Sequence, residues 1–384
     1  MLVELLQVRN LRCYSTVSLP CAPGLNVLFG SNGAGKTTLL EAICIGAWGK
    51  TLNSPDAALL RLGTRHYWVR IDARSDLGVP YWVEVEYSPD RGKHIRSAHG
   101  SSLSPRELVG TIPIVFLAPT TKEITMGAPR ERRRFLDMVL AQSSRPYLEL
   151  LLAHRRILQQ RNALLQRQLS DPNFSFQWKS WTKQFVRISA EIVWRRWRFL
   201  QEFEPLVQAA FQQIAPETLK LSYIPDSIPP ECLEQGTEAI AAHLYQHSSK
   251  LESEEFRRGT TLFGPQKDEL LFLLNGQLAR EGASQGQHKS IVLSLKLAEL
   301  AYLRQQCGKL PIVLLDDVFA ELDRQRAHEV LATLEELAAQ CFVTVTEPER
   351  VPESMNHHFY WVHVEAGTVH PLPHSKDTEG NSKL

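Results

Sequence analysis

The sequence predicts an α/β fold with a mixed sheet, an antiparallel β subdomain and an inserted lobe of antiparallel helices. Three observations lead to this fold class. A glycine-rich loop lies between a strand pattern and a helix pattern at residues 30–37. A buried strand that ends in two carboxylates lies far downstream, at residues 311–317. Between them, residues 130–214 change to helical periodicity.

The glycine-rich loop, called the phosphate loop below, fits the pattern G-x-x-x-x-G-K-[ST] at every specified position. It reads Gly30-Ser31-Asn32-Gly33-Ala34-Gly35-Lys36-Thr37, followed by Thr38. Glycines let backbone N–H groups face a phosphate, and the start of a helix adds favourable partial charge. We expect this segment to bind a nucleotide, with Lys36 on the β- and γ-phosphates and Thr37 as a ligand of Mg²⁺.

The carboxylate-ended strand reads Pro311-Ile312-Val313-Leu314-Leu315-Asp316-Asp317. This pattern is typical of a buried parallel strand whose polar end lies at the carboxyl edge of its sheet. We expect Asp316 to hold Mg²⁺ through water, facing Thr37, and Asp317 to polarise the attacking water. Lys36, Asp316 and Asp317 are the candidate catalytic residues.

A third segment, Ser284-Gln285-Gly286-Gln287, precedes a long helix pattern. Taken alone, it is as typical of an ordinary capped helix as of an anion-binding helix start. One chain does not easily use two such helix starts on one γ-phosphate. We therefore expect two copies of the chain to face each other, each giving Ser284, Gly286 and Gln287 to the other's nucleotide. Glu321-Leu322-Asp323 fits a loop that reaches across the same interface, with Asp323 at the nucleotide.

Strand patterns define the antiparallel subdomain. Residues 2–8 and 15–19 are expected strands, and 65–75 and 80–88 alternate as a half-buried antiparallel hairpin does. Further strands are expected at 112–117, 270–274 and 342–346.

The helical lobe is predicted from two apolar stripes, over 148–165 and 178–192, that flank the turn signal at 170–173. We expect two antiparallel helices. Trp178 and Trp181 fit the core of the helix pair better than a base-stacking platform. The predicted segments are an N-terminal ATPase lobe at 1–125, a basic helical lobe at 126–250, a C-terminal ATPase lobe at 251–366 and a disordered tail at 367–384.

Charge is distributed unevenly along the chain. The formal net charge is +1, but residues 130–200 carry 15 Lys and Arg against 5 Asp and Glu. An excess of this kind is an electrostatic footprint for the phosphate backbone of DNA; a solvated helical face and an acidic partner are the alternatives. The candidate DNA contacts are Arg132, Arg133, Arg155, Arg156 and, downstream, Lys267.

Bulk composition excludes several classes of protein. The six cysteines show no metal-ligand spacing and no disulfide framework, which suits a reducing cytoplasm. No apolar run is long enough to span a bilayer, and Glu4 and Gln7 interrupt the apolar N-terminus where a signal peptide would lie. A cytoplasmic location is expected.

The order of these motifs resembles the ABC-type P-loop ATPase heads of the SMC class. Three stretches narrow the resemblance to the RecF family of bacterial recombination-repair proteins, over about residues 2–365. They are Leu262-Phe263-Gly264-Pro265-Gln266-Lys267-Asp268-Glu269, Gly127-Ala128-Pro129-Arg130 with Arg133-Arg134-Phe135-Leu136-Asp137, and Gln160-Arg161-Asn162-Ala163-Leu164-Leu165.

The resemblance implies ATP and Mg²⁺ as cofactors and a dimer that forms on ATP binding. It implies DNA binding, weak DNA-stimulated ATP hydrolysis, and help in loading recombinase at single-strand gaps and in replication restart, with RecR and RecO as partners. It also places Arg12 over the nucleotide. Two other functions stay open: a peripheral transporter ATPase, and a scaffold in which ATP only organises a docking surface. The preferred DNA structure stays open as well.

Four segments depart from patterns found in related ATPase heads. Gln266-Lys267-Asp268-Glu269 stands where the family usually has His-Arg-Asp-Asp, and Thr120-Thr121-Lys122 lacks an acidic residue, so no metal role is expected there. Asp317, which the family shares, is one methylene shorter than the Glu of transporter-type heads. Since a misplacement near 1 Å can cost on the order of 100-fold in rate, slow hydrolysis is expected. No His follows the strand at 342–346, and Thr344 or Thr346 would contact the γ-phosphate only weakly.

Overall fold

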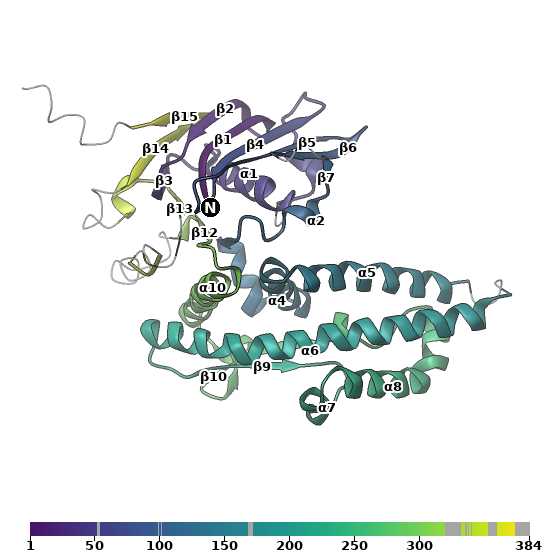
Figure 1. Cartoon of the computed structure of the whole chain (residues 1–384). Coiled ribbons are helices and arrows are strands. Elements are labelled where there is room, and N and C mark those ends of the chain that lie inside the picture. The colour runs from purple at the N-terminus through teal and green to yellow at the C-terminus, as the bar shows by residue number, and fades with distance from the viewer. Residues whose placement is uncertain are drawn as a thin grey trace, which may run out of the picture. The chain divides into compact units, whose positions relative to one another are not determined.

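The computed structural model describes residues 1–51, 54–98, 100, 102–167, 172–318, 332–334, 336, 338, 340–351 and 359–372. It divides into two compact units. Unit 1 comprises Met1–Thr121 and Glu299–Leu384, and unit 2 comprises Lys122–Ala298. The expected α/β fold class, with a mixed sheet, an antiparallel β subdomain and a helical insertion, is confirmed (Figure 1).

The first sheet of unit 1 is antiparallel and has the strand order β2-β1-β4-β5-β6-β7. Its strands are β1 (Leu2–Leu11), β2 (Tyr14–Pro20), β4 (Tyr67–Arg74), β5 (Pro80–Ser88), β6 (Gly92–Ser97) and β7 (Ser102–Leu103). The expected hairpin is present, with β4 and β5 paired from Tyr67↔Tyr87 to Arg74↔Pro80. Val69, Ile71 and Val85 are buried on one face, as the period-two alternation predicts.

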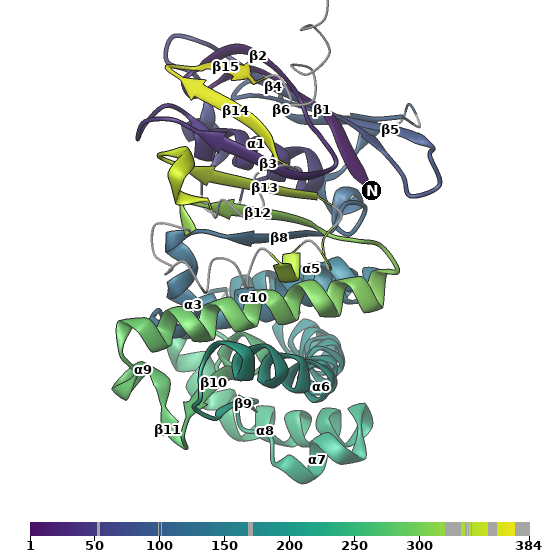
Figure 2. The ribbon, with the colours of Figure 1, turned by 90° about the vertical axis from the view of Figure 1, so that its left-hand side faces the viewer.

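The second sheet of unit 1 is mixed and positions the nucleotide motifs (Figure 2). Its order is β15-β14-β3-β13-β12-β8, with β3 (Gly24–Phe29), β8 (Ile114–Leu117), β12 (Ile312–Asp316), β13 (Gln340–Val345), β14 (Tyr360–Glu365) and β15 (Thr368–Pro371). The pairings along β8, β12, β13, β3 and β14 are parallel, and β15 is antiparallel. Only β13 separates β3 from β12. The phosphate loop, which follows β3, and Asp316, the last residue of β12, therefore lie at the same edge of the sheet and close together.

Helix α1 (Lys36–Trp48) follows the phosphate loop and packs against β4 of the first sheet and against β12 and β13 of the second. Of its 13 residues 11 are buried, and Thr37 and Glu41 form its polar face. A Cβ at Gly46 would lie 2.2 Å from the Ile71 side chain, so only glycine allows this approach of helix to strand. The short elements of this unit are η1 (Asp56–Leu59), α2 (Pro105–Leu108) and η5 (Pro348–Arg350); η2 (Pro119–Lys122) ends at the unit boundary.

Unit 2 is built on long helices (Figure 1). They are α4 (Pro129–Ser143), α5 (Arg145–Leu165), α6 (Phe174–Ile214) and α8 (Thr237–Arg258), with the shorter α3 (Glu123–Met126), α7 (Pro230–Gln235) and α9 (Ala279–Gly282). The 41 residues of α6 span about 60 Å. The expected antiparallel pair is α5 and α6; residues 170 and 171 of the expected turn lie outside the described part of the chain.

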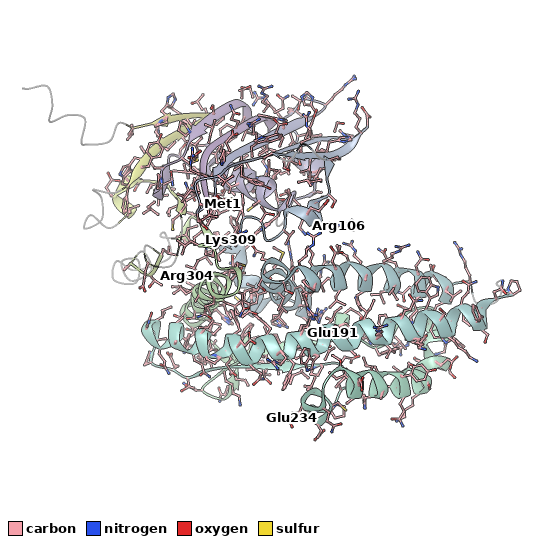
Figure 3. The ribbon with its side chains drawn as sticks, viewed as in Figure 1. Met1, Arg106, Glu191, Glu234, Arg304 and Lys309 are labelled. Atoms are coloured by element: carbon pink, nitrogen blue, oxygen red, sulfur yellow. The ribbon has the colours of Figure 1, made fainter. Side chains whose placement is uncertain are left out.

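A small antiparallel sheet completes unit 2. Its order is β11-β10-β9, from β9 (Leu219–Ile224), β10 (Glu269–Leu274) and β11 (Gln277–Leu278), with η3 (Pro265–Lys267) before β10. Helix α10 (Gln285–Cys307) begins in unit 2 and ends in unit 1. Glu191 lies midway along α6 and Glu234 on α7 (Figure 3). The division into three lobes and a tail stays a prediction, although α8 runs through its boundary at residue 250. The expectation of disorder from residue 367 is corrected at 368–371, which form strand β15 paired with β14.

Over the residues that the structure describes, no helix is long and apolar enough to cross a membrane.

Charged pairs are buried in the core of unit 2. Arg161 and Glu255 are both 0% exposed and lie 2.7 Å apart, and the Arg161 guanidinium stacks on Trp178 at 4.1 Å. Arg196 is 2.7 Å from Asp268. Trp178 is 5% exposed and therefore belongs to the core of the helical unit, as predicted. Removing one partner of such a pair leaves an uncompensated buried charge and typically costs about 3–5 kcal/mol.

His154 on α5 is expected to make unit 2 sensitive to acid. It is 8% exposed, and its ring lies 5.3 Å from that of Phe185 at a tilt of 33°. Burial, with the positive charge of Arg196, lowers the pKa of His154 to about 4 from its usual 6.5. The folded state therefore holds a neutral imidazole, and its contribution is fully present above pH 6.5 and is lost as the pH falls toward 4. The linkage contribution is up to about 3 kcal/mol between pH 7 and pH 4.

Urea unfolding followed at several pH values tests this expectation. The His154→Gln variant should show a shallower decrease of unfolding free energy with acid than the unaltered chain. His66→Gln, at an exposed position of unit 1, is the matched control. Equal slopes for the His154 variant and the unaltered chain would contradict the assignment.

Candidate nucleotide site

The phosphate loop connects β3 to α1 and requires glycine at two positions for steric reasons. Gly30 has φ +151°, and a Cβ there would lie 2.1 Å from the backbone oxygen of Val364. At Gly35, with φ +114°, a Cβ would lie 2.6 Å from Cys13 Sγ and 2.7 Å from Tyr14 Oη. The loop therefore packs closely against β14 and against the β1–β2 turn, and these contacts restrict its backbone to the observed conformation.

Lys36 and the loop backbone form the cationic part of the site. The Lys36 side chain is 8% exposed, and its Nζ donates to Gly30 O at 2.6 Å and to Ser31 O at 2.9 Å. Burial lowers the pKa of Lys36, while the carboxylates of Asp317 and Asp316 raise it. The ammonium is therefore held inside the loop where a phosphate would be surrounded by N–H groups.

Thr37 and Asp316 meet although 279 positions separate them in the sequence. Thr37 Oγ1 lies 2.8 and 2.9 Å from the two carboxylate oxygens of Asp316 and donates to them. Hydroxyl and carboxylate oxygens are the ligands that Mg²⁺ prefers. Within the described residues, no group of three or more His, Cys, Asp or Glu side chains could hold a metal ion. The Thr37 hydroxyl and the Asp316 carboxylate could hold Mg²⁺ together, and that role stays a prediction.

Thr344 on β13 organises the acidic pair. Its hydroxyl donates to Asp316 Oδ1 at 2.9 Å and accepts from the Asp317 backbone N–H at 2.8 Å. Asp317 has φ +51°, in the left-handed region that is unfavourable for most side chains. The sequence suggested Thr344 or Thr346 as weak contacts of the γ-phosphate; the structure instead bonds Thr344 to Asp316 and Asp317.

A hollow of about 280 Å³ opens beside Thr37 and Asp316. Its other lining residues are Glu41, Cys44, Phe116, Ala118, Pro119 and Thr120. The loop after β8 thus contributes Thr120 and no carboxylate, as its sequence indicated. Glu41 supplies a carboxylate that the sequence interpretation missed. The available signal was its spacing, because a residue four positions after Thr37 lies on the same face of a helix.

Arg12 is bound to Glu41. Its two terminal nitrogens lie 2.9 Å from the two Glu41 oxygens, and Nη2 also donates to Ser54 Oγ at 2.9 Å. Burial raises the pKa of Glu41, and the charge of Arg12 lowers it. The structure therefore attaches Arg12 to a wall of the hollow; its predicted contact with nucleotide stays a prediction.

The segment Ser284–Gln287 begins α10 in unit 2. Ser284 N donates to Gln287 Oε1 at 2.8 Å and Gln287 N donates to Ser284 Oγ at 3.2 Å, which is the reciprocal pattern of a capping box. Ser284, Gln285 and Gly286 are exposed. The candidate loop residue Asp323 lies outside the described residues, with Glu321 and Leu322.

The candidate DNA contacts differ in exposure. Arg132 is 2% exposed and binds Glu269 through two nitrogens, at 2.7 and 2.8 Å, and Arg133 donates to Asp268 O at 2.7 Å. Both arginines bind residues that follow about 135 positions later in the chain; Arg132 is buried and Arg133 is half-buried, and the contact of each with DNA stays a prediction. Arg155, Arg156 and Lys267 are exposed.

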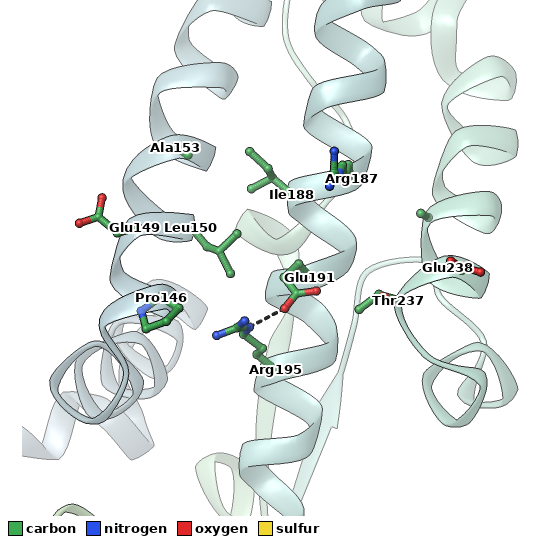
Figure 4. A pocket seen from close by; sticks show the side chains of 11 residues that line it. Pro146, Glu149, Leu150, Ala153, Arg187, Ile188, Glu191, Arg195, Thr237 and Glu238 are labelled. Carbon is green, nitrogen blue, oxygen red and sulfur yellow. Dashed lines mark hydrogen bonds and ion pairs between the residues drawn. The ribbon is translucent and has the colours of Figure 1, made fainter. Parts of the chain in front are cut away.

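A larger hollow of about 710 Å³ lies within unit 2, between α5, α6 and α8 (Figure 4). Apolar residues such as Leu150 and Ile188 alternate there with charged ones, and Arg195 is bound to Glu191 at 2.6 Å. No glycine is among its lining residues, so it lacks the glycine-rich backbone of a phosphate-binding loop. It does not have the chemistry of a nucleotide site.

The fold and this site define an ABC-type ATPase head. The family model described as "AAA domain" matches residues 5–174. A solved Smc head bound to the C-winged helix domain of ScpA superposes with a TM-score of 0.56 at 15% identity, covering 99% of this chain and 100% of that one. At that identity the likeness concerns the fold alone.

Closer relatives specify the family. The "DNA replication and repair protein RecF" of Chloroherpeton thalassium is 38% identical, covering 87% of this chain and 92% of the relative. That of Salinibacter ruber is 32% identical and covers 100% and 95%. The solved "recombination mediator protein RecF-ATP in RecFOR pathway" has a TM-score of 0.90 at 27% identity, covering 97% of this chain and 98% of that one. The chain belongs to the RecF family.

Proposed function

We propose that this protein is an ATP-dependent DNA-binding protein of recombinational repair. ATP joins two copies head to head, the dimer clamps DNA, and slow, DNA-stimulated hydrolysis releases it. In the cytoplasm this switch assists recombinase loading at single-strand gaps and replication restart, with RecR and RecO as partners. The proposal rests on membership of the RecF family and on the titles of the solved relatives, which name ATP and the RecFOR pathway.

One observation carries the nucleotide part of the proposal. Thr37 and Asp316, from opposite ends of the chain, already lie within 2.9 Å of each other beside the phosphate loop. This brings the expected Mg²⁺ ligands to one point without any rearrangement of the sheet. A bound ATP would supply the phosphates that Lys36 and the loop N–H groups neutralise, and Mg²⁺ would replace the direct contact between the hydroxyl and the carboxylate.

Asp317 is the proposed residue for orienting the attacking water. Its backbone is fixed by the hydrogen bond to Thr344, and its side chain is one methylene shorter than glutamate. A rigid backbone with a short side chain holds water at a less favourable distance, which supports slow, switch-like hydrolysis. Lys36 and Asp316 then act by positioning charge rather than by transferring protons.

In the proposed dimer, the second copy contacts the nucleotide through Ser284, Gly286 and Gln287. Their helix start is exposed. The capping box occupies the N–H groups of Ser284 and Gln287, so the backbone N–H groups of Gln285 and Gly286 are the donors that this helix start offers to an anion. We propose that each copy presents this helix start to the nucleotide of the other. Asp323, in the loop that follows the acidic strand, and Arg12, in the β1–β2 turn, add further contacts to the nucleotide. Two identical sites would then form on one two-fold axis.

The alternatives have less support. A peripheral transporter ATPase would not account for identities of 32–38% with RecF proteins over most of the chain. A scaffold in which ATP is bound but never hydrolysed is a variant of the proposed switch. The scaffold and the switch differ only in whether the bound ATP is hydrolysed. Phosphate release measured with and without DNA separates them.

DNA binding measured with and without ATP, over a series of salt concentrations, tests the proposed function. We expect ATP to tighten binding, and the logarithm of the affinity to fall with the logarithm of salt at a slope of about −4 or steeper, since each phosphate contact contributes about −0.9. Binding that is independent of both ATP and salt would contradict the clamp.

The same measurement tests the exposed arginines. Arg155→Glu combined with Arg156→Glu should make the salt slope shallower by about 2, whatever the DNA sequence. Arg257→Glu with Arg258→Glu on α8 is the control with the same change of charge, because both of those residues bind Glu254. An unchanged slope in the first variant would exclude these arginines from the DNA surface.

A further inference from the structure

The side-chain amide of Gln287 is fixed at both ends. Its oxygen accepts from the Ser284 backbone N–H at 2.8 Å, and its nitrogen donates to Glu217 Oε1 at 2.9 Å. Because the two ends of an amide differ in hydrogen-bonding character, this pair of partners selects one orientation of the group. Glu217 is therefore connected, through one side chain, to the backbone at the start of α10.

Glu217 lies on a rigid junction. It follows the end of α6 at Ile214 by three positions and precedes β9. The neighbouring Thr218 exchanges two hydrogen bonds with Asn275 at the β10–β11 turn, with Thr218 N donating to Oδ1 at 2.9 Å and Asn275 N donating to Thr218 O at 2.8 Å. Leu221 N donates to Glu204 of α6 at 2.9 Å. The Glu217 carboxylate, which binds Gln287, therefore lies on a backbone segment that is hydrogen-bonded to both α6 and the small sheet.

We propose that Glu217 is a positioning residue for ATP-dependent pairing of two copies. It holds the Gln287 amide, whose oxygen binds the Ser284 N–H, so that the exposed first turn of α10 keeps one geometry. The inference rests on the proposed function, in which that helix start completes the nucleotide site of the second copy. Glu217 itself touches neither the nucleotide nor the reacting atoms.

Glu217→Ala removes the acceptor and frees one end of the amide. We expect ATP binding by the single chain to stay within about twofold, and the affinity of ATP-dependent dimerisation to fall on the order of tenfold, because hydrogen bonds to charged groups are among the stronger ones. Glu217→Gln keeps an acceptor oxygen and should restore most of the dimerisation. Glu281→Ala, an exposed carboxylate on α9, is the matched control.

A reciprocal exchange tests the contact directly. Gln287→Glu alone places two carboxylates face to face and should weaken dimerisation. Combining it with Glu217→Gln restores one donor and one acceptor, so dimerisation should recover. Failure of this recovery would overturn the proposal, because Gln287 would then act through the nucleotide alone. This comparison stays informative if Glu217→Ala fails to fold.

Sedimentation velocity with ATP and Mg²⁺, with thermal unfolding as a check of folding, separates the outcomes. If the unaltered chain does not dimerise with ATP, the proposed function fails, and this inference fails with it. If the unaltered chain dimerises and the Glu217→Ala variant dimerises equally well, only the inference fails. A variant with a lower melting temperature but unchanged dimerisation would assign Glu217 a purely structural role, which also overturns it.

Discussion

Replacing Lys36 with alanine is expected to abolish ATP binding and, with it, ATP-dependent dimerisation and ATP-dependent DNA binding. Lys36 Nζ is enclosed by the phosphate loop, where it donates to two backbone carbonyls, and it is the loop's own cation. Charge-assisted hydrogen bonds to phosphate are among the strongest in proteins, so we expect a loss of about 100-fold or more in ATP affinity.

Fluorescent ATP-analogue titration measures the loss, and sedimentation with ATP measures its consequence. Lys250→Ala, an exposed lysine of α8, is the control and should leave both unchanged. The alanine at position 36 also removes two hydrogen bonds within the loop, so thermal unfolding must be compared in parallel. A folded Lys36→Ala variant that still dimerised and bound DNA in an ATP-dependent manner would refute the gating by nucleotide.

Replacing Ser284 with arginine is expected to leave ATP binding within about threefold of normal and to abolish ATP-dependent dimerisation. Ser284 is exposed, so the larger side chain is accommodated in the single chain, at a cost of about 1 kcal/mol for the lost helix cap. In the proposed dimer the same side chain would occupy the place of the second copy's phosphates and loop. We expect dimer affinity to fall by about 100-fold or more.

Gln277→Arg is the matched control, since Gln277 is exposed on β11 of the same unit. The same titration and sedimentation experiments decide the result. Loss of ATP binding in the Ser284→Arg variant would place Ser284 in the site of its own chain, and normal dimerisation would remove it from the interface.

The nucleotide motifs could be predicted because each is a local pattern with a local cause. Gly30 and Gly35 are required by their backbone angles and by the atoms packed against them, and an apolar run that ends in Asp316 has few alternatives to a buried parallel strand. The contact between Thr37 and Asp316 followed from joining the two motifs. The long antiparallel pair α5 and α6, which lies between the two motifs, was predicted from apolar periodicity and from the turn signal at 170–173.

Contacts between distant residues could not be predicted in the same way. Arg132, Arg161 and Arg196 belong to the basic segment and read as surface cations, yet all three are buried, because Glu269, Glu255 and Asp268 reach them from later in the chain. Fewer Lys and Arg side chains of residues 130–200 are therefore exposed to solvent than the sequence count of 15 suggests. The contacts of Thr344 with Asp316 and Asp317, and that of Glu217 with Gln287, gave no sequence signal, because they arise only where segments from different parts of the chain meet.

The most direct test of a nucleotide site shared between two copies is to mix two inactive variants. Lys36→Ala lacks a working phosphate loop but keeps Ser284, and Ser284→Arg keeps the phosphate loop but lacks its helix start. With ATP, neither should dimerise alone. Mixed and labelled with a donor and an acceptor fluorophore, they should form a heterodimer with one complete site, seen as ATP-dependent energy transfer. Absence of transfer in the mixture, or dimerisation of Ser284→Arg alone, would contradict a site completed by the second copy.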